Sequence, residues 1–188
     1  SAGCFPDNRI PASRFHPMAL KLMEYYPLPN RVDIRNNYIV SADDQDVNDT
    51  FIWKLDHRLS EKRSISGRYQ KRFARNSAPF AGSDLARFGN KQRDDRSLLG
   101  IDYTHMFSPA MLIEVRGGLS RNATRERTIW DGRNVAAELE LPGTTTEPEL
   151  LGFPRFTVLD HFAIGSVADQ PIQYHVTDIQ GSAKFTWV

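Results

Sequence analysis

The side chains that could carry out chemistry are scattered along this 188-residue chain. Its five histidines form no i, i+4 pair and no HExxH motif, so they lack the spacing of a zinc protease. Ser108 precedes a proline and lies outside the G-x-S-x-G frame of a hydrolase nucleophile. The chain has no glycine-rich phosphate loop, and its single cysteine, Cys4, cannot form an internal disulfide. The sequence therefore predicts that the chain is not an enzyme, with no catalytic or cofactor-binding residue and no cofactor.

One acidic stretch has part of the spacing of a metal site. Asp44, Asp46 and Asn48 alternate like the first ligands of a calcium-binding loop. However, Asp49 stands where such a loop needs glycine, and Leu55 stands where it needs a bidentate glutamate. We therefore interpret the stretch as a solvated acidic loop and predict no metal-binding residue.

Composition restricts the classes of partner. With 24 basic and 23 acidic residues the net charge is +1, so no bulk field attracts nucleic acid, and we expect no nucleic-acid partner. No stretch approaches the ~18 apolar residues of a membrane helix, and the chain does not open with a signal peptide. Because the strands of a membrane barrel need only about 10 residues and alternate polar with apolar, the outer membrane stays open as a location.

Residues 96–122 alternate with a period of two, which predicts a long antiparallel hairpin around a tight turn at 108–110. Its two phases differ in character. The apolar phase includes Leu99, Ile101, Ile113 and Val115, whereas the other phase includes Asp102, Glu114 and Arg116. Alternation alone does not distinguish a soluble sheet with one wet face from a wall between lipid and a watery lumen. In a membrane wall, the apolar set would face lipid and the charged set would face the lumen.

The rest of the chain extends this pattern to a mainly β fold of antiparallel up-and-down strands, about five in number, with one short helix near the N-terminus. The helix is expected at residues 16–26, with Phe15, Ala19, Leu22, Met23 and Tyr26 packing against a neighbouring element. The strands are expected near residues 51–59, 63–73, 96–107, 111–122 and 171–188.

The connections between these strands alternate between short and long. The short ones, SEK and SPA, lie at one end of the strands, and the long segments 74–95 and 123–170 lie at the other. This sorting is typical of an outer-membrane barrel with short periplasmic turns and long extracellular loops. We therefore divide the chain into an extracellular loop region, 1–50, and a transmembrane β-barrel segment, 51–188.

Aromatic residues of the apolar phase gather near the strand ends. In a barrel they would form two interfacial girdles, and in a soluble sandwich they would form the core. The residues concerned are Phe51, Trp53, Tyr69, Phe73, Tyr103, Phe107, Phe185 and Trp187. His57 and His105 also lie on this phase, and we expect them beside a girdle aromatic.

A family resemblance is carried, in order, by NRIPASRFHPMALKLMEYYPLPN, DHRLSEKRSISGRY, THMFSPAMLIEVRGGLSR and QYHVTDIQGSAKFTWV. These stretches resemble the barrel of TonB-dependent outer-membrane receptors, most closely the Oar-like group, whose members carry a carboxypeptidase-regulatory-like N-terminal domain. His16 stands where that group usually has aspartate. LELPG and GFPRF resemble pieces of an extracellular loop of the same group.

The resemblance implies an internal segment of a 22-stranded barrel, without the plug domain and the motif that contacts TonB. It implies energy-coupled uptake of a large or scarce substrate across the bacterial cell outer membrane. The implied partners are outer-membrane lipid, the plug domain, the TonB complex and an unknown transported substrate, and the ligand-binding residues are unknown. The alternative hypothesis is a surface adhesin or carbohydrate-binding β domain that uses aromatic and acidic loop residues.

Overall fold

The computed structural model describes residues 5, 9–81, 83, 85–159, 162–167 and 169–188. The chain divides into two compact units, and each is described by itself. The sheet unit comprises residues 44–78, 91–127 and 171–188, and the loop unit comprises residues 1–43, 79–90 and 128–170. Among the described residues, no helix is both long enough and apolar enough to cross a membrane.

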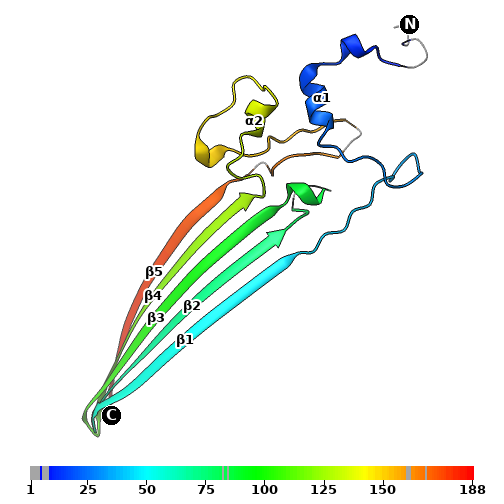
Figure 1. Ribbon diagram of the computed structural model, residues 1–188. Coiled ribbons are helices and arrows are strands. Elements are labelled where there is room, and N and C mark those ends of the chain that lie inside the picture. Colours follow the sequence, from blue (N-terminus) through cyan, green and yellow to red (C-terminus); the bar gives the residue numbers. More distant parts are fainter. Residues whose placement is uncertain (1–4, 6–8, 82, 84, 160–161, 168) are drawn as a thin grey trace. The chain divides into compact units, whose positions relative to one another are not determined.

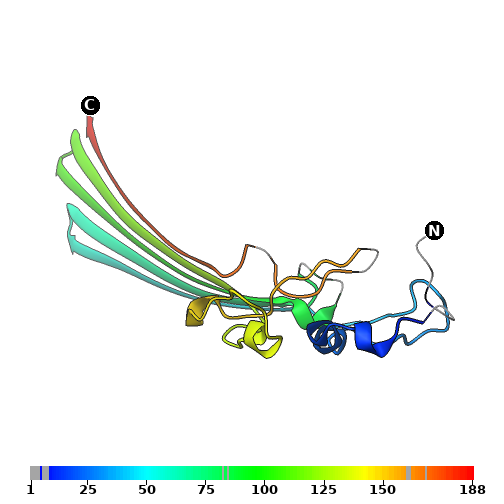
Figure 2. The same ribbon diagram turned by 90° about the horizontal axis from the view of Figure 1, so that it is seen from above.

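Five strands form one antiparallel sheet in sequence order, as Figure 1 shows. They are β1 (Gln45–Ser60), β2 (Arg63–Ala78), β3 (Asn90–Ser108), β4 (Met111–Thr128) and β5 (Ile172–Trp187). The five strands curve together along their length, which is clearest in Figure 2. The expected mainly β class, with antiparallel up-and-down strands and a short helix near the N-terminus, is confirmed.

Strands β1 to β4 are longer than the sequence pattern suggested, with lengths from 16 to 19 residues. β5 is one residue shorter at each end than the expected 171–188. The extension lies where the long loops join: β1 begins at Gln45, β2 ends at Ala78, β3 begins at Asn90 and β4 ends at Thr128. These ends carry polar side chains on both phases, so they show no hydrophobic alternation. The backbone ladder forms there nonetheless, because every N–H and C=O group needs a partner whatever its side chain.

The two short turns are built in the same way. At the end of β1 the Ser60 hydroxyl accepts a hydrogen bond from Lys62 N at 3.3 Å. At the end of β3 the Ser108 hydroxyl accepts one from Ala110 N, also at 3.3 Å. Each serine thereby satisfies a turn N–H that has no partner in the ladder.

The register sorts the side chains onto two faces, because directly opposed residues in a sheet share a face. We call the face of the odd-numbered strand residues the apolar face and that of the even-numbered residues the polar face. Val115 opposes Ala183 and Trp53 opposes Tyr69 on the apolar face. Glu114 opposes Lys184 and Lys54 opposes Arg68 on the polar face.

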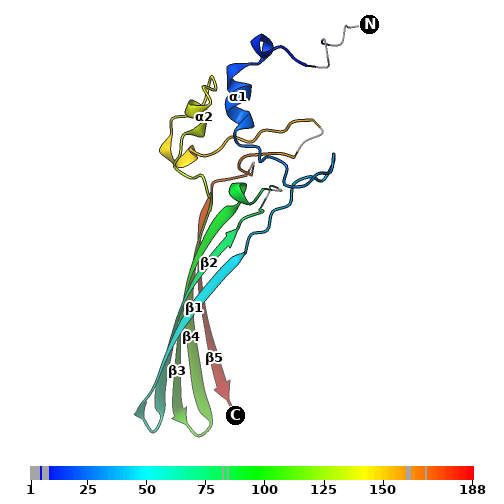
Figure 3. The same cartoon turned by 45° about the vertical axis from the view of Figure 1, so that its right-hand side comes forward.

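The loop unit contains short helical elements joined by irregular chain. They are η2 (Ala12–Arg14), α1 (Pro17–Met23), η3 (Ala86–Phe88), α2 (Val135–Glu138) and η4 (Pro148–Leu150). Helix α1 is shorter than the expected 16–26, because His16 is its N-cap, Pro17 is its first residue and Glu24 is already its C-cap. Figure 3 shows α1 and α2 from a second direction.

The packed face of α1 differs from the one the spacing suggested. Met18, Leu22, Tyr25 and Tyr26 pack on the core of the loop unit. Phe15 and Met23, which we expected on that face, are exposed. The contact stripe is therefore rotated toward Met18, which lies four residues before Leu22 and thus on the same side of the helix.

The hydrophobic core of the described residues lies in the loop unit. Phe153 is its centre, with its ring centroid 4.8 Å from that of Phe88 and 4.7 Å from that of Tyr25. Both contacts have the edge-to-face geometry that aromatic pairs favour. The buried members are Leu85, Phe88, Val135, Leu139, Phe153 and Ile164.

Candidate functional site

The polar face of the sheet unit holds a shallow groove of about 980 Å³. Strands β2 to β5 each contribute to its lining. Its polar side chains are Arg68, Gln70, Asp102, Arg116, Ser120, Asp178, Gln180 and Ser182. The groove exists because alternation directs the even-numbered residues of four neighbouring strands to one side.

Arg116 is the centre of the charge arrangement in this groove. Its Nε lies 3.3 Å from Asp102 Oδ1, and its Nη2 lies 3.6 Å from Glu114 Oε1. About two thirds of the Arg116 side chain is exposed, so water screens both pairs and each contributes little to stability, ~1 kcal/mol at most. These groups can therefore exchange their partners for a polar ligand at low cost.

A second polar contact lies farther along the groove. The Ser120 hydroxyl donates a hydrogen bond to Asp178 Oδ2 at 3.1 Å across the β4–β5 pair. Nearer the turn end, Glu114, Arg116, Ser182 and Lys184 line a smaller hollow of about 220 Å³. The face thus presents hydrogen-bond donors, acceptors and charges of both signs, an arrangement suited to binding or passage of polar molecules.

Within β4, Gly118 lies where a side chain of the neighbouring strand approaches the backbone closely. A Cβ at Gly118 would lie 2.9 Å from Gln180 Nε2, so the Gln180 side chain occupies the space that a larger residue would take. Gly117 points to the other face, opposite Gly181 in the register.

The histidines that the sequence singled out are not brought together. On the apolar face His105 lies between aromatic rings, with its ring centroid 4.2 Å from that of Phe107 and 6.3 Å from that of Tyr103. His105 thus lies beside Phe107, one of the aromatic residues that we expected near the strand ends. His16 caps α1, where its Nδ1 accepts from Met18 N at 3.3 Å. His161 and Cys4 lie outside the described residues.

The acidic stretch that we interpreted as a solvated loop is strand from Gln45 onward, because it pairs with β2. Asn48 Oδ1 accepts a hydrogen bond from Arg72 Nε at 2.8 Å, and Asp46 opposes Asn76 in the ladder. Within the part of the chain that the structure describes, no group of three or more His, Cys, Asp or Glu side chains is placed to hold a metal ion.

Two ion pairs fix the loop unit. Arg133 contacts Glu138 through two hydrogen bonds of 2.8 and 2.7 Å, and these bonds hold the pKa of the Glu138 carboxyl below its ordinary value. Lys21 on α1 contacts Glu140 Oε1 at 2.8 Å and lowers the pKa of that carboxyl too. Burial raises the pKa of Tyr26, whose hydroxyl donates to Phe162 O at 3.4 Å. These contacts position loops and offer no nucleophile paired with a base.

Sequence reasoning did not identify the groove or the core of the loop unit. The groove needs four strands in register, and its residues are separated by up to 114 positions between Arg68 and Ser182. The loop core had a weak signal in LELPG and GFPRF, which contain the buried Leu139 and Phe153. Nothing in those stretches alone indicated that they pack together.

Comparison with known proteins agrees with this geometry. A family model described as "Outer membrane beta barrel domain" matches residues 2–188. No curated protein and no solved structure is significantly similar to the chain. The family match spans the sheet unit and the loop unit alike, and it accounts for long strands with one apolar face. The chain belongs to the outer membrane β-barrel domain family, and its location is the bacterial outer membrane.

Proposed function

We propose that this chain forms part of the wall of a TonB-dependent transporter of the Oar-like group, which takes up a large or scarce substrate with energy from the inner membrane. The observation that carries this proposal is the charged groove on the polar face, on the opposite side of the sheet from an apolar belt. The polar face then lines the lumen, and the apolar face contacts lipid.

The apolar belt has the height of a membrane core. It runs over Leu99–Phe107 on β3, Met111–Leu119 on β4 and Ile179–Trp187 on β5. About nine residues at ~3.3 Å each give ~30 Å along a strand, and the ~40° tilt of barrel strands reduces this to ~23 Å. Outer-membrane barrels carry an apolar band of about 25 Å, so the belt fits their hydrocarbon layer.

The sheet edges support a larger closed barrel. β1 pairs with β2 and β5 pairs with β4, which leaves one edge of each outer strand open in the five-stranded order. Unpaired backbone groups cost several kcal/mol each in hydrocarbon, so a membrane sheet closes on itself. In this proposal other strands of the barrel complete both edges.

The polar face supports passage rather than catalysis. Arg116, Asp102 and Glu114 are exchangeable charges, and in the proposed transporter they contact the plug domain when the path is closed and polar substrate when it is open. The segment's partners are then outer-membrane lipid on one face and the plug on the other, with TonB acting through the plug.

The alternative of an adhesin or a carbohydrate-binding domain needs aromatic rings presented to a ligand. In the loop unit Tyr25, Trp130 and Phe153 pack against one another, with centroid distances of 4.7 to 5.8 Å. Trp130 Nε1 also donates to Arg87 O, so the polar edge of its ring is engaged. Within the residues that the structure describes, these contacts give the alternative no specific support.

Cysteine labelling tests which face is wet. Ala183 and Ser182 are small, exposed neighbours on β5 that point to opposite faces. In the full-length protein without other cysteines, we expect Ser182→Cys to react with a membrane-impermeant maleimide in whole cells. Ala183→Cys should be protected until detergent is added. Equal labelling of the two variants would contradict the assignment of the apolar face to lipid.

Binding of TonB tests the transporter assignment itself. The full-length protein is expected to bind the purified periplasmic domain of TonB, and uptake by its host should stop when a protonophore removes the proton-motive force. An adhesin would show neither behaviour. A full-length protein without TonB binding would overturn this assignment while leaving the barrel intact.

A further inference from the structure

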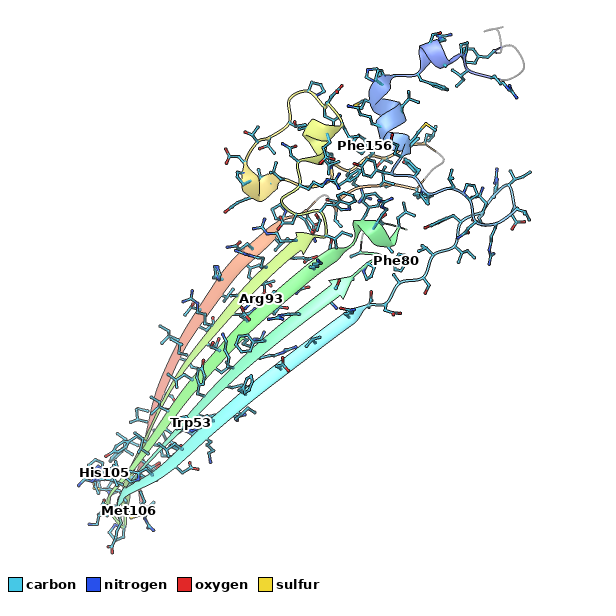
Figure 4. The ribbon with its side chains drawn as sticks, viewed as in Figure 1. Trp53, Phe80, Arg93, His105, Met106 and Phe156 are labelled. Carbon is cyan, nitrogen blue, oxygen red and sulfur yellow. The ribbon has the colours of Figure 1, made fainter. Side chains whose placement is uncertain are left out.

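A cluster of cations lies on the apolar face, beyond the belt and toward the ends of the strands that join the long loops. We call it the basic cluster, and it consists of Arg75, Lys91, Arg93, Arg125 and Arg127. Its members line a hollow of about 450 Å³ together with Gln45, Val47, Asn76, Ser77 and Gln92. Figure 4 places Arg93 well along the sheet from His105 and Met106, which lie at the turn end. A lumen-lining role does not use this cluster, because it is on the other face.

Gathering these cations on neighbouring strands costs free energy. Like charges on cross-strand neighbours repel each other, whereas opposite charges attract. Arg93 Nε contacts Asp95 at 3.0 Å, so one carboxylate on this face offsets one cation. Arg75 opposes the apolar Val47. The charges of Arg75, Lys91 and Arg125 favour an anion brought from outside the chain.

The position of the cluster indicates where that anion comes from. Phe51 and Phe73 pack edge to face at 6.5 Å on the apolar face, in the manner of interfacial girdle residues. Lys71 Nζ lies 4.9 Å from the Phe73 ring centroid and Arg75 follows Phe73 by two residues, which is ~7 Å along the strand. The headgroup layer beyond the hydrocarbon is roughly 5–8 Å thick. Arg75 therefore reaches the level of lipid headgroups on the outside of the barrel.

We propose that the basic cluster binds the phosphate groups of an outer-leaflet lipid. This inference rests on the proposed function, since it requires the apolar face to contact lipid and the long loops to be extracellular. Four of the five cations are arginines, whose planar guanidinium groups bind phosphate oxygens in pairs. The acyl chains of such a lipid would lie along the belt below, so one molecule would match both parts of the face.

The test measures binding of lipid A to the full-length protein reconstituted in neutral phosphatidylcholine nanodiscs. The triple variant Arg75→Gln, Lys91→Gln, Arg125→Gln is expected to bind lipid A about 100-fold more weakly, since each cation near an anionic lipid surface strengthens attraction about fivefold. The matched control is Arg58→Gln, Arg72→Gln, Arg96→Gln, which removes the same charge from even positions. We expect less than about a twofold change there, because those arginines face the lumen.

Four outcomes would overturn the proposal. The first is unchanged lipid A binding by the cluster variant, and the second is an equal loss in the cluster and control variants. The third is that the wild-type protein binds lipid A as tightly after both phosphates have been removed, and the fourth is that it binds inorganic phosphate equally tightly. If the triple variant does not assemble, Arg75→Gln and Arg125→Gln are measured singly, each with an expected loss of about fivefold. Unchanged binding by both single variants would also overturn the proposal.

The cysteine labelling described above separates this inference from the proposed function. Labelled Ser182→Cys and protected Ala183→Cys with no lipid A selectivity would overturn the lipid site alone. Equal labelling of both positions would overturn the face assignment on which the lipid site depends.

Discussion

The two units treat the same kinds of side chain in opposite ways. In the loop unit Phe88 and Phe153 are 0% and 1% exposed, whereas in the sheet unit Phe51 and Trp53 are 65% and 61% exposed. Water drives the first pair into a protein core. Lipid chains are as apolar as a leucine side chain, so the second pair needs no protein cover in a membrane. Burial within the protein therefore identifies the core of the loop unit. It does not identify the apolar surface of the sheet, which lipid chains can cover instead.

The largest expected effect comes from emptying the loop core. Leu139→Ala should destabilise the loop unit by roughly 2–5 kcal/mol, because Leu139 is 1% exposed and its removal leaves a cavity. Amide hydrogen exchange of loop peptides in the full-length protein measures the change. Leu28→Ala is the matched control, and at 85% exposure it should change the stability by no more than ~0.5 kcal/mol. Equal effects at the two leucines would show that the loop unit lacks a fixed core.

The stability of the sheet should depend on which face receives an added charge. Ala183→Arg places a cation on the apolar face near mid-belt and should cost roughly 2–4 kcal/mol, whereas Ser182→Arg on the polar face should cost less than ~1 kcal/mol. Folding titrations of the full-length barrel into lipid bilayers measure both values. A Ser182→Arg variant that is the less stable of the two would reverse our assignment of the faces.

A smaller effect is expected where the sheet buries a polar side chain. Thr124 on β4 is 4% exposed, and its hydroxyl donates to Asp94 on β3. Thr124→Val keeps the shape and removes the donor, so we expect a loss of about 1.5 kcal/mol, typical of a hydrogen bond to a charged group. Thr50→Val, at an exposed position of β1, serves as the control in the same bilayer titration. If both valine variants match the wild type, the Thr124–Asp94 bond contributes nothing to the wall.

The smallest effect concerns pH and the loop unit alone. The pKa of Glu138 is lowered from 4.5 in the folded state, mainly by its hydrogen bond from Arg133. The stabilisation is therefore complete above pH 4.5 and is lost as the pH falls below it through the folded-state pKa. Limited proteolysis of the loops should accelerate over that interval, and Glu138→Gln should flatten the profile. A wild-type profile without any change there would rule out a stabilising role for this pair.

The sheet was predictable because its signal is local. Leu99, Ile101, Ile113 and Val115 alternate with polar residues, and that period alone placed them on one face. The added lengths of β1 and β3 were missed because Gln45–Thr50 and Asn90–Asp95 have no such period. Their pairing is set by the neighbouring strand and not by their own side chains.

The loop unit was not predictable from local pattern. Phe88, Val135 and Phe153 come from three separate segments, and each segment alone reads as an irregular connection. These segments can contact one another only after the strands that connect them have paired and brought them close together. The rotated face of α1 has the same cause, since its partners decide which stripe is buried, and the choice of Met18 over Met23 is invisible in the helix itself.

The composition of the loop core has a consequence for the order of assembly. Leu22 precedes the first hairpin in the chain, Phe88 lies between the two hairpins, and Leu139 follows the second. Each hairpin can form from neighbouring residues, but this core requires contacts that bracket both, and such long-range contacts form slowly. We therefore expect the core to form after β1–β4 have paired. Once formed, it should lower the rate at which the two hairpins separate during unfolding.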